Sequence, residues 1–70
     1  MNFQQVLLKA SNLLKLKNIR SPNLDSELLL AKTLNKGREH VLLNLNNKID
    51  QSDLIKFNHY LNLRYQYKPI

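Results

Sequence analysis

The spacing of the apolar residues restricts this chain to helical folds more than any other feature of its sequence. Near the start of the chain, the apolar residues recur every three or four positions, which places them on one face of an α-helix, with polar residues opposite. These apolar residues are Phe3, Val6, Leu7, Ala10, Leu13 and Leu14. The pattern predicts a first helix from about Asn2 to Lys17.

Composition supports the same fold class. Sixteen of the 70 residues are Leu, a strong helix former, whereas only one Gly and two Pro interrupt the chain. No run of β-branched residues predicts a strand. We therefore expect an all-α fold, a small compact bundle of four to five helices.

A second helix is predicted from about Pro22 to Leu34. Ser21 is a favoured N-cap residue, and Pro22 suits the first helical position because its missing N–H would be unpaired there. Asp25 and Glu27 fall in or near the first turn, where carboxylates suit the helix dipole. Apolar residues on more than one side make this the predicted central helix: Leu24, Leu28, Leu29, Leu30, Ala31 and Leu34.

The turn Asn35-Lys36-Gly37 is predicted to end the second helix. Gly37 is the residue expected to take a positive φ there, because glycine has no Cβ to clash. A short helix follows from Arg38 to about Leu45. Its inward-facing residues are expected to be Val41, Leu42 and Leu45.

A last helix is predicted after the turn Asn46-Asn47-Lys48. The run Asp50-Gln51-Ser52-Asp53 resembles a capping box, although Asp replaces the usual Glu or Gln. The helix should end near Tyr67, before Pro69. Its apolar stripe consists of Leu54, Phe57, Leu61 and Tyr65.

The residues that catalysis or a cofactor would need are missing from this sequence. A nucleotide or S-adenosylmethionine site of the common α/β kind needs a glycine-rich turn after a strand, and a thiolate metal site needs Cys, which is absent. The four serines have no His at helical spacing that could act as a base. We predict no catalytic, cofactor-binding or metal-binding residue and no enzymatic activity of the chain alone.

Two histidines could suggest a metal site, with carboxylate help from Glu39 or Asp53. His40 and His59 lie on different predicted helices, however, and neither has a second His four residues away. We therefore interpret both as partly exposed polar residues.

The net charge of +6 would favour an acidic partner. A basic helix–turn–helix is one alternative, in which the helix after Gly37 would enter the major groove and could reach bases only through Arg38, Glu39, His40 and Asn44. Another basic feature mixes aromatic and cationic residues as single-strand binders do: Tyr60, Arg64, Tyr65, Tyr67 and Lys68. The scattered lysines fit a solvated surface better, so nucleic acid is the less favoured partner.

No apolar run approaches the roughly 18–20 residues that span a bilayer, and no signal-peptide pattern precedes the first helix. We expect a soluble, cytoplasmic monomer that does not enter membranes.

Three motifs in order resemble one family. They are Ser21-Pro22-x-Leu24-Asp25-Ser26-Glu27-Leu28-Leu29-Leu30-Ala31, the Gly37-Arg38 break, and Leu61-x-x-Arg64-x-x-x-Lys68-Pro69-Ile70. Together they resemble the N-terminal domain of the release-factor glutamine methyltransferases, the HemK family. Ser26 replaces the Ala of the family pattern, and Tyr65 stands where a second Arg is often found.

This resemblance implies the role of the chain. Residues 1–67 would form a helical N-terminal accessory domain, and residues 68–70 would begin a linker to a catalytic domain that this chain lacks. That domain would bind S-adenosylmethionine and N5-methylate the glutamine of a Gly-Gly-Gln loop in class 1 peptide release factors. The helical domain would help to hold the release factor. The alternative is a free-standing basic helical module that binds nucleic acid.

Overall fold

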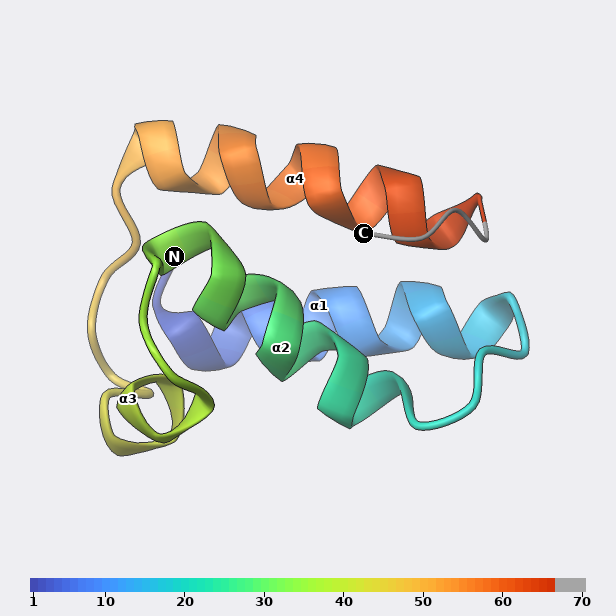
Figure 1. Ribbon diagram of the computed structural model, residues 1–70, viewed down its shortest axis with the longest axis horizontal. Coiled ribbons are helices and arrows are strands. Elements are labelled where there is room, and N and C mark those ends of the chain that lie inside the picture. Colours follow the sequence, from blue (N-terminus) through green and yellow to red (C-terminus); the bar gives the residue numbers. More distant parts are fainter. Residues whose placement is uncertain (67–70) are drawn as a thin grey trace.

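The computed structural model describes residues 1–66, which form four helices and no strand. They are α1 (Phe3–Leu16), α2 (Pro22–Leu34), α3 (Arg38–Leu43) and α4 (Gln51–Tyr65). Helices α1 and α4 run in the same direction, α2 runs opposite to both, and the short α3 lies across one end (Figure 1). The all-α prediction is confirmed, with four helices.

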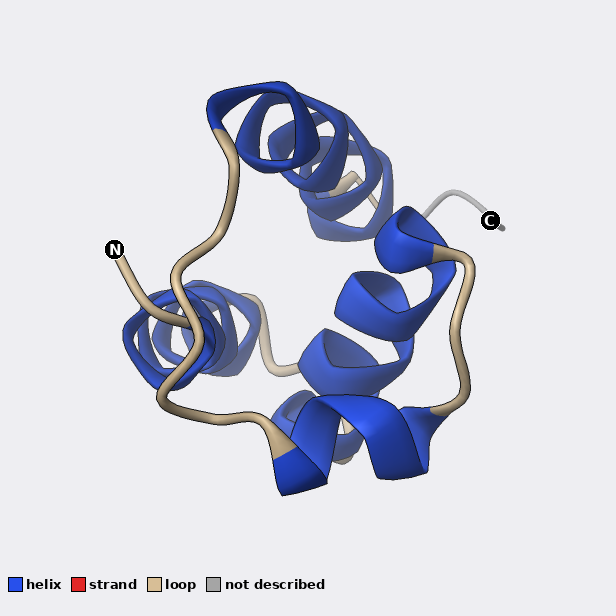
Figure 2. Cartoon of the chain, turned by 90° about the vertical axis from the view of Figure 1, so that its left-hand side faces the viewer, coloured by secondary structure: helices blue, strands red, loops and turns tan. Residues whose placement is uncertain are grey.

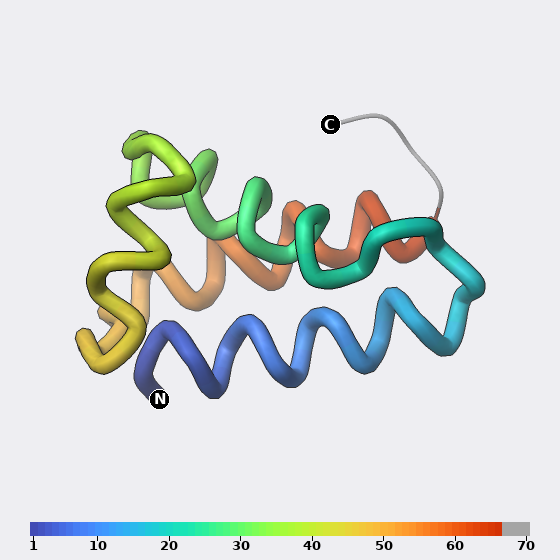
Figure 3. Tube along the Cα trace, turned by 90° about the horizontal axis from the view of Figure 1, so that it is seen from below, coloured from blue at the N-terminus to red at the C-terminus, as the bar shows by residue number. Residues whose placement is uncertain are grey.

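Helix α2 is the centre of the fold, as the sequence predicted. It packs against each of the other three helices, and Figure 2 shows it between α4 on one side and α3 on the other. Figure 3, which views the chain from below, shows the same antiparallel course of α1 and α2. The buried apolar side chains come from all four helices and one loop: Phe3, Val6, Ala10, Leu14, Ile19, Leu29, Leu30, Ala31, Val41, Phe57 and Leu61.

The apolar stripes predicted for α1 and α4 are confirmed, but those of the two middle helices need correction. On α2, Leu30 is fully buried, whereas Leu28 is 48% exposed. Helix α3 ends at Leu43 and not at Leu45, and its Leu42 is 40% exposed, so Val41 alone is buried there. Periodicity identified the helices correctly, but which apolar side chains are covered depends on where the neighbouring helices lie.

The predicted caps of α2 and α4 are wrong in detail. Ser21 stands at the N-cap of α2 but lies in the left-handed region, with a φ of 57°, and its side chain makes no capping hydrogen bond. Asp50 caps α4 without a side-chain hydrogen bond, so the predicted capping box does not form. At the end of α2 it is Asn35 that takes the positive φ of 56°, while Gly37 has a φ of −78°.

A capping box that the sequence analysis missed begins α1. The Oδ1 atom of Asn2 accepts the backbone N–H of Gln5 at 2.9 Å, and the Gln5 side chain accepts the Asn2 N–H at 3.0 Å. Further N–H groups at this end are bonded by the segment before α4, because Phe3 donates to the Asn47 carbonyl at 2.9 Å and Gln4 to that of Leu45 at 3.0 Å. The N-terminus is thereby attached to the α3–α4 connection.

None of the helices formed by residues 1–66 combines the length and the apolar character needed to cross a bilayer. The predicted end of the last helix near Tyr67 lies outside the described residues, since α4 is described as far as Tyr65.

Candidate interaction surface

Two ion pairs connect α2 to its neighbours within residues 1–66. The Nε atom of Arg38 lies 2.7 Å from Oε1 of Glu27, which joins α3 to α2. Arg64 donates from Nε and Nη2 to Oδ2 of Asp25, at 3.0 and 2.8 Å, which joins α4 to α2. All four residues belong to the motifs on which the family resemblance rests. Asp25 is in the first turn of α2, as predicted, but its bond to Arg64 was not anticipated.

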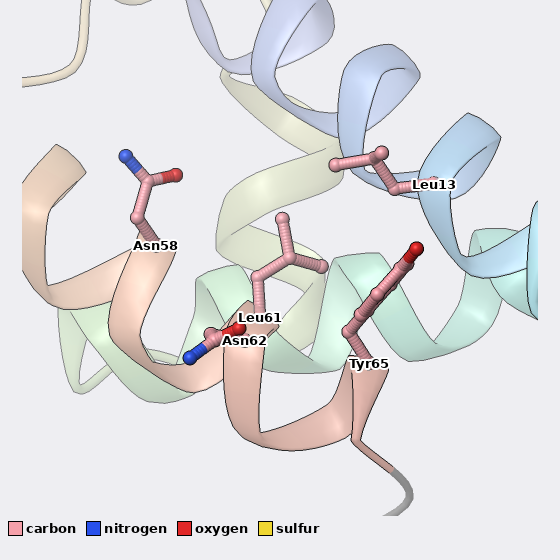
Figure 4. A pocket seen from close by; sticks show the side chains of 5 residues that line it. All are labelled: Leu13, Asn58, Leu61, Asn62 and Tyr65. Carbon is pink, nitrogen blue, oxygen red and sulfur yellow. The ribbon is translucent and has the colours of Figure 1, made fainter.

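A groove runs between α1 and α4. It consists of two adjoining hollows of about 270 and 280 Å³ that share Leu13, Asn58 and Leu61. We call them together the α1–α4 groove. Asn62 and Tyr65 complete the first hollow, and Figure 4 shows Leu61 and Tyr65 of α4 extending toward Leu13 of α1. The second is completed by Met1, Val6, Lys9, Ala10, Leu54 and Phe57.

The sequence of α4 explains why this groove stays open. Asn58 and Asn62 are four residues apart and share the face that carries Leu54, Leu61 and Tyr65. Both amides are exposed, and short polar side chains cannot fill the space that a Leu or Phe would fill. On the α1 side, the small Ala10 adds little volume. Helices α1 and α4 therefore pack firmly against α2 but leave a cleft between themselves.

The charges around the α1–α4 groove are positive. Lys9 lines it, and none of the side chains that line either hollow is acidic. At the far end, Nζ of Lys17 lies 4.8 Å from the centre of the Tyr65 ring, a cation–π distance. The groove thus combines an apolar floor with amide groups and a cationic edge.

A further hollow of about 220 Å³ lies where α1, α2 and α3 meet. Three of its polar side chains are already used within the fold. Ser11 donates to the Leu8 carbonyl and Ser26 to that of Asn23, while Glu27 is paired with Arg38. We therefore regard the α1–α4 groove as the stronger candidate for binding a partner.

The histidines do not come together. His40 is on α3 and His59 is exposed on α4, where its ring lies 6.0 Å from that of Tyr60. Throughout residues 1–66, no group of three or more His, Cys, Asp or Glu side chains is placed to hold a metal ion.

Two of the four residues considered for DNA reading are engaged elsewhere. Arg38 is bonded to Glu27, and the Asn44 side chain donates to the His40 carbonyl at 2.7 Å. Helix α3 has only six residues, and its Leu43 and Leu42 are exposed where a reading helix would need polar side chains.

The aromatic and cationic residues of α4 are also used within the fold. Tyr60 packs against the core and lies 5.2 Å from Nζ of Lys32, and Arg64 binds Asp25. The Tyr60 ring therefore covers the edge of the core. Tyr67 and Lys68, the other members of the set, lie outside the described residues.

The α1–α4 groove itself was missed at the sequence level. The signal that could have indicated it is the pair Asn58 and Asn62 on an otherwise apolar stripe. A stripe interrupted in this way predicts a helix face that is not fully packed.

Residues 1–66 thus define a small all-helical module whose main surface feature is an apolar groove with a cationic edge. Comparison with known proteins assigns the module to a family. The model of the PrmC N-terminal domain matches residues 5–70, and the chain belongs to this family. This confirms the resemblance predicted from the three motifs and makes the chain a methyltransferase-associated domain.

Similar curated proteins are bifunctional methyltransferases of Rickettsia. The chain is 33% identical to that of Rickettsia felis and 30% identical to those of Rickettsia typhi and Rickettsia prowazekii, each over 69 residues. The match covers 99% of this chain but only 13% of each relative, so the chain spans about an eighth of their length. No solved structure gave a significant match.

Proposed function

We propose that this chain is the substrate-recognition domain of a cytoplasmic, S-adenosylmethionine-dependent methyltransferase. The parent enzyme would N5-methylate the glutamine of the Gly-Gly-Gln loop in class 1 peptide release factors. Residues 1–67 would form the recognition domain, and residues 68–70 would begin the linker to the catalytic domain. The observation that carries the proposal is the family match over residues 5–70.

The cofactor would be held by another part of the parent enzyme. The only Gly of the chain, Gly37, lies between two helices and not after a strand, and no carboxylate that could bind a ribose lines the α1–α4 groove. The residues described here therefore do not fit S-adenosylmethionine, and we derive no chemical step from them.

What this chain can contribute is binding energy away from the reacting atoms. Contacts remote from the chemistry can be used to orient the reacting group, which makes the attack effectively intramolecular. The net charge of +6 suits a partner with an acidic surface. The α1–α4 groove supplies apolar area that such a partner could cover.

The proposal is tested by nuclear magnetic resonance on the ¹⁵N-labelled chain. A class 1 release factor is added, with a basic protein of similar size as the control. We expect saturable shift changes with the release factor and none with the control. Since weak binding also shifts resonances, unchanged spectra up to the highest soluble concentration of release factor would remove the proposal.

A further inference from the structure

The α1–α4 groove has the form of a vacant helix position. Helices α1 and α4 run in parallel, and both pack on the antiparallel α2 (Figures 1 and 2). The two hollows lie between α1 and α4. Leu54 and Tyr65, which line the two ends of the groove, are eleven residues apart on α4, so the groove is about 16 Å long. That length matches about three turns of helix.

Two large exposed apolar side chains extend the apolar surface beyond the groove floor. Leu16 is 77% exposed and follows Leu13 by three residues on α1, so it is on the same side of that helix. Ile55 is 61% exposed and precedes Asn62 by seven residues, which places it on the outer edge of α4. Neither residue lines a hollow, but Leu16 extends the apolar surface toward the end of α1 and Ile55 extends it toward the start of α4.

We propose that the α1–α4 groove binds an amphipathic helical segment of a protein partner, with an apolar face flanked by acidic residues. An amphipathic helix inserts its i, i+3, i+4 and i+7 side chains into an apolar groove of this kind. The acidic flanks would lie near Lys9 and the two asparagine amides, which can donate hydrogen bonds to carboxylates. This identification of the partner segment rests on the proposed function, since the protein substrate would supply the helix.

The charge distribution argues against a second copy of this chain as the occupant. Each copy carries a net charge of +6, so pairing two grooves would bring together two positively charged surfaces, each with Lys9 at the groove. No acidic side chain lines the groove to neutralise them. Like charges brought together in this way oppose association.

The experiment uses a labelled 14-residue peptide with Leu at helical spacing and Glu at its other positions. Its binding to the 70-residue chain is measured by fluorescence anisotropy at low salt, together with a matched peptide in which Lys replaces every Glu. We expect the Glu peptide to bind and the Lys peptide to bind at least about tenfold more weakly. Equal binding of both peptides would contradict the acidic partner.

Two charge reversals locate the site. Lys9→Glu lies at the groove, whereas Lys56→Glu makes the same change in the middle of α4 at an exposed residue that lines no hollow. We expect Lys9→Glu to weaken binding of the Glu peptide about five- to tenfold and Lys56→Glu by less than about twofold. An equal effect of both would show that only the net charge matters and would overturn the proposal.

Peptide-induced resonance shifts identify the occupied surface. We expect them at Leu13, Asn58, Leu61 and Asn62; shifts centred on α3 would contradict the groove. Concentration-dependent shifts of these residues without peptide would indicate a second copy as the occupant, which also overturns the proposal.

If the release factor binds but Lys9→Glu has no effect, the proposed function stands and this inference fails. If the Glu peptide binds the groove but no release factor binds the chain, the inference stands and the proposed function fails.

Discussion

Arg64, in the last turn of α4, donates two hydrogen bonds to a single carboxylate oxygen of Asp25 in the first turn of α2, at 3.0 and 2.8 Å. The two residues are 39 positions apart in the chain. This pair holds the C-terminal end of α4 against the N-terminal end of α2. It therefore helps to set the position of the helix that forms one wall of the candidate site.

Replacing Arg64 by Ala should lower the free energy of unfolding by about 1 kcal/mol, because the pair is only partly buried. For a domain of this size that corresponds to a fall of about 4–8 °C in the melting temperature. A double-mutant cycle with Asp25→Ala, followed by urea unfolding, isolates the interaction. Arg20→Ala, at an exposed loop residue, is the control. Strict additivity of the two substitutions would show that the pair contributes nothing.

Leu28 and Leu30 of α2 both belong to the predicted apolar surface of the central helix, but their replacement by Ala should change the stability by very different amounts. Leu30→Ala should cost about 2–5 kcal/mol, because the side chain is fully buried and a cavity remains. Leu28→Ala should cost less than about 1 kcal/mol, because nearly half of the residue is exposed. Thermal unfolding of both variants measures the difference. A loss at Leu28 as large as that at Leu30 would mean that α2 is rotated relative to the arrangement described here.

Ser21 should tolerate replacement by Ala. A serine that capped α2 through its hydroxyl would lose about 0.5–2 kcal/mol on this change. Since the Ser21 side chain makes no capping bond, we expect a change within about 0.5 kcal/mol. Ser21→Gly should be equal or more stable, because glycine adopts the left-handed conformation without strain. Chemical denaturation of the two variants tests this, and a clear loss in Ser21→Ala would restore the capping hypothesis.

Asn2→Ala should destabilise the chain by about 1 kcal/mol, because the capping box at the start of α1 loses both its acceptor and its geometry. Asp50→Asn serves as the matched change at the start of α4, where no side-chain cap is formed. It should cost less, since only the interaction of a charge with the helix dipole is altered. Circular dichroism during heating records both. Equal melting temperatures for the two variants would contradict the difference between the caps.

The nucleic-acid alternative predicts a different behaviour. A protein that contacts several phosphates loses affinity steeply as salt increases. Because Arg38 is paired with Glu27 and Arg64 with Asp25, we expect no sequence-specific binding to double-stranded DNA and at most weak binding at low salt. Anisotropy titrations with duplex and single-stranded oligonucleotides decide this. Tight binding that falls steeply with salt would favour the nucleic-acid module.

Helix type and number followed from the sequence because the apolar spacing is a local property. The stripe Phe3, Val6, Ala10 and Leu14 and the stripe Leu54, Phe57 and Leu61 were both predicted and both face the core. The family was also predicted from the sequence, through motifs whose order and spacing are read directly from the chain. Helix ends were less certain, since α3 stops two residues early, at Leu43.

The groove and the ion pairs could not be predicted because they depend on residues distant in the chain. Asp25 and Glu27 look alike in the sequence as carboxylates in or near the first turn of α2, and only the packing of α4 and α3 against α2 assigns one to Arg64 and the other to Arg38. Likewise, Asn58 and Asn62 become groove residues only because α1 approaches α4 without filling the space between them.

The sequence by itself determined an all-helical fold, its central helix and its family, because each depends on local spacing and on motif order. The tertiary structure alone decided which leucines are buried, which residues cap the helices and where a partner can bind. Those properties arise from the relative positions of whole helices. Those positions depend on the volume and shape of side chains that meet across the core, and the local spacing of apolar residues does not specify how these side chains fit together.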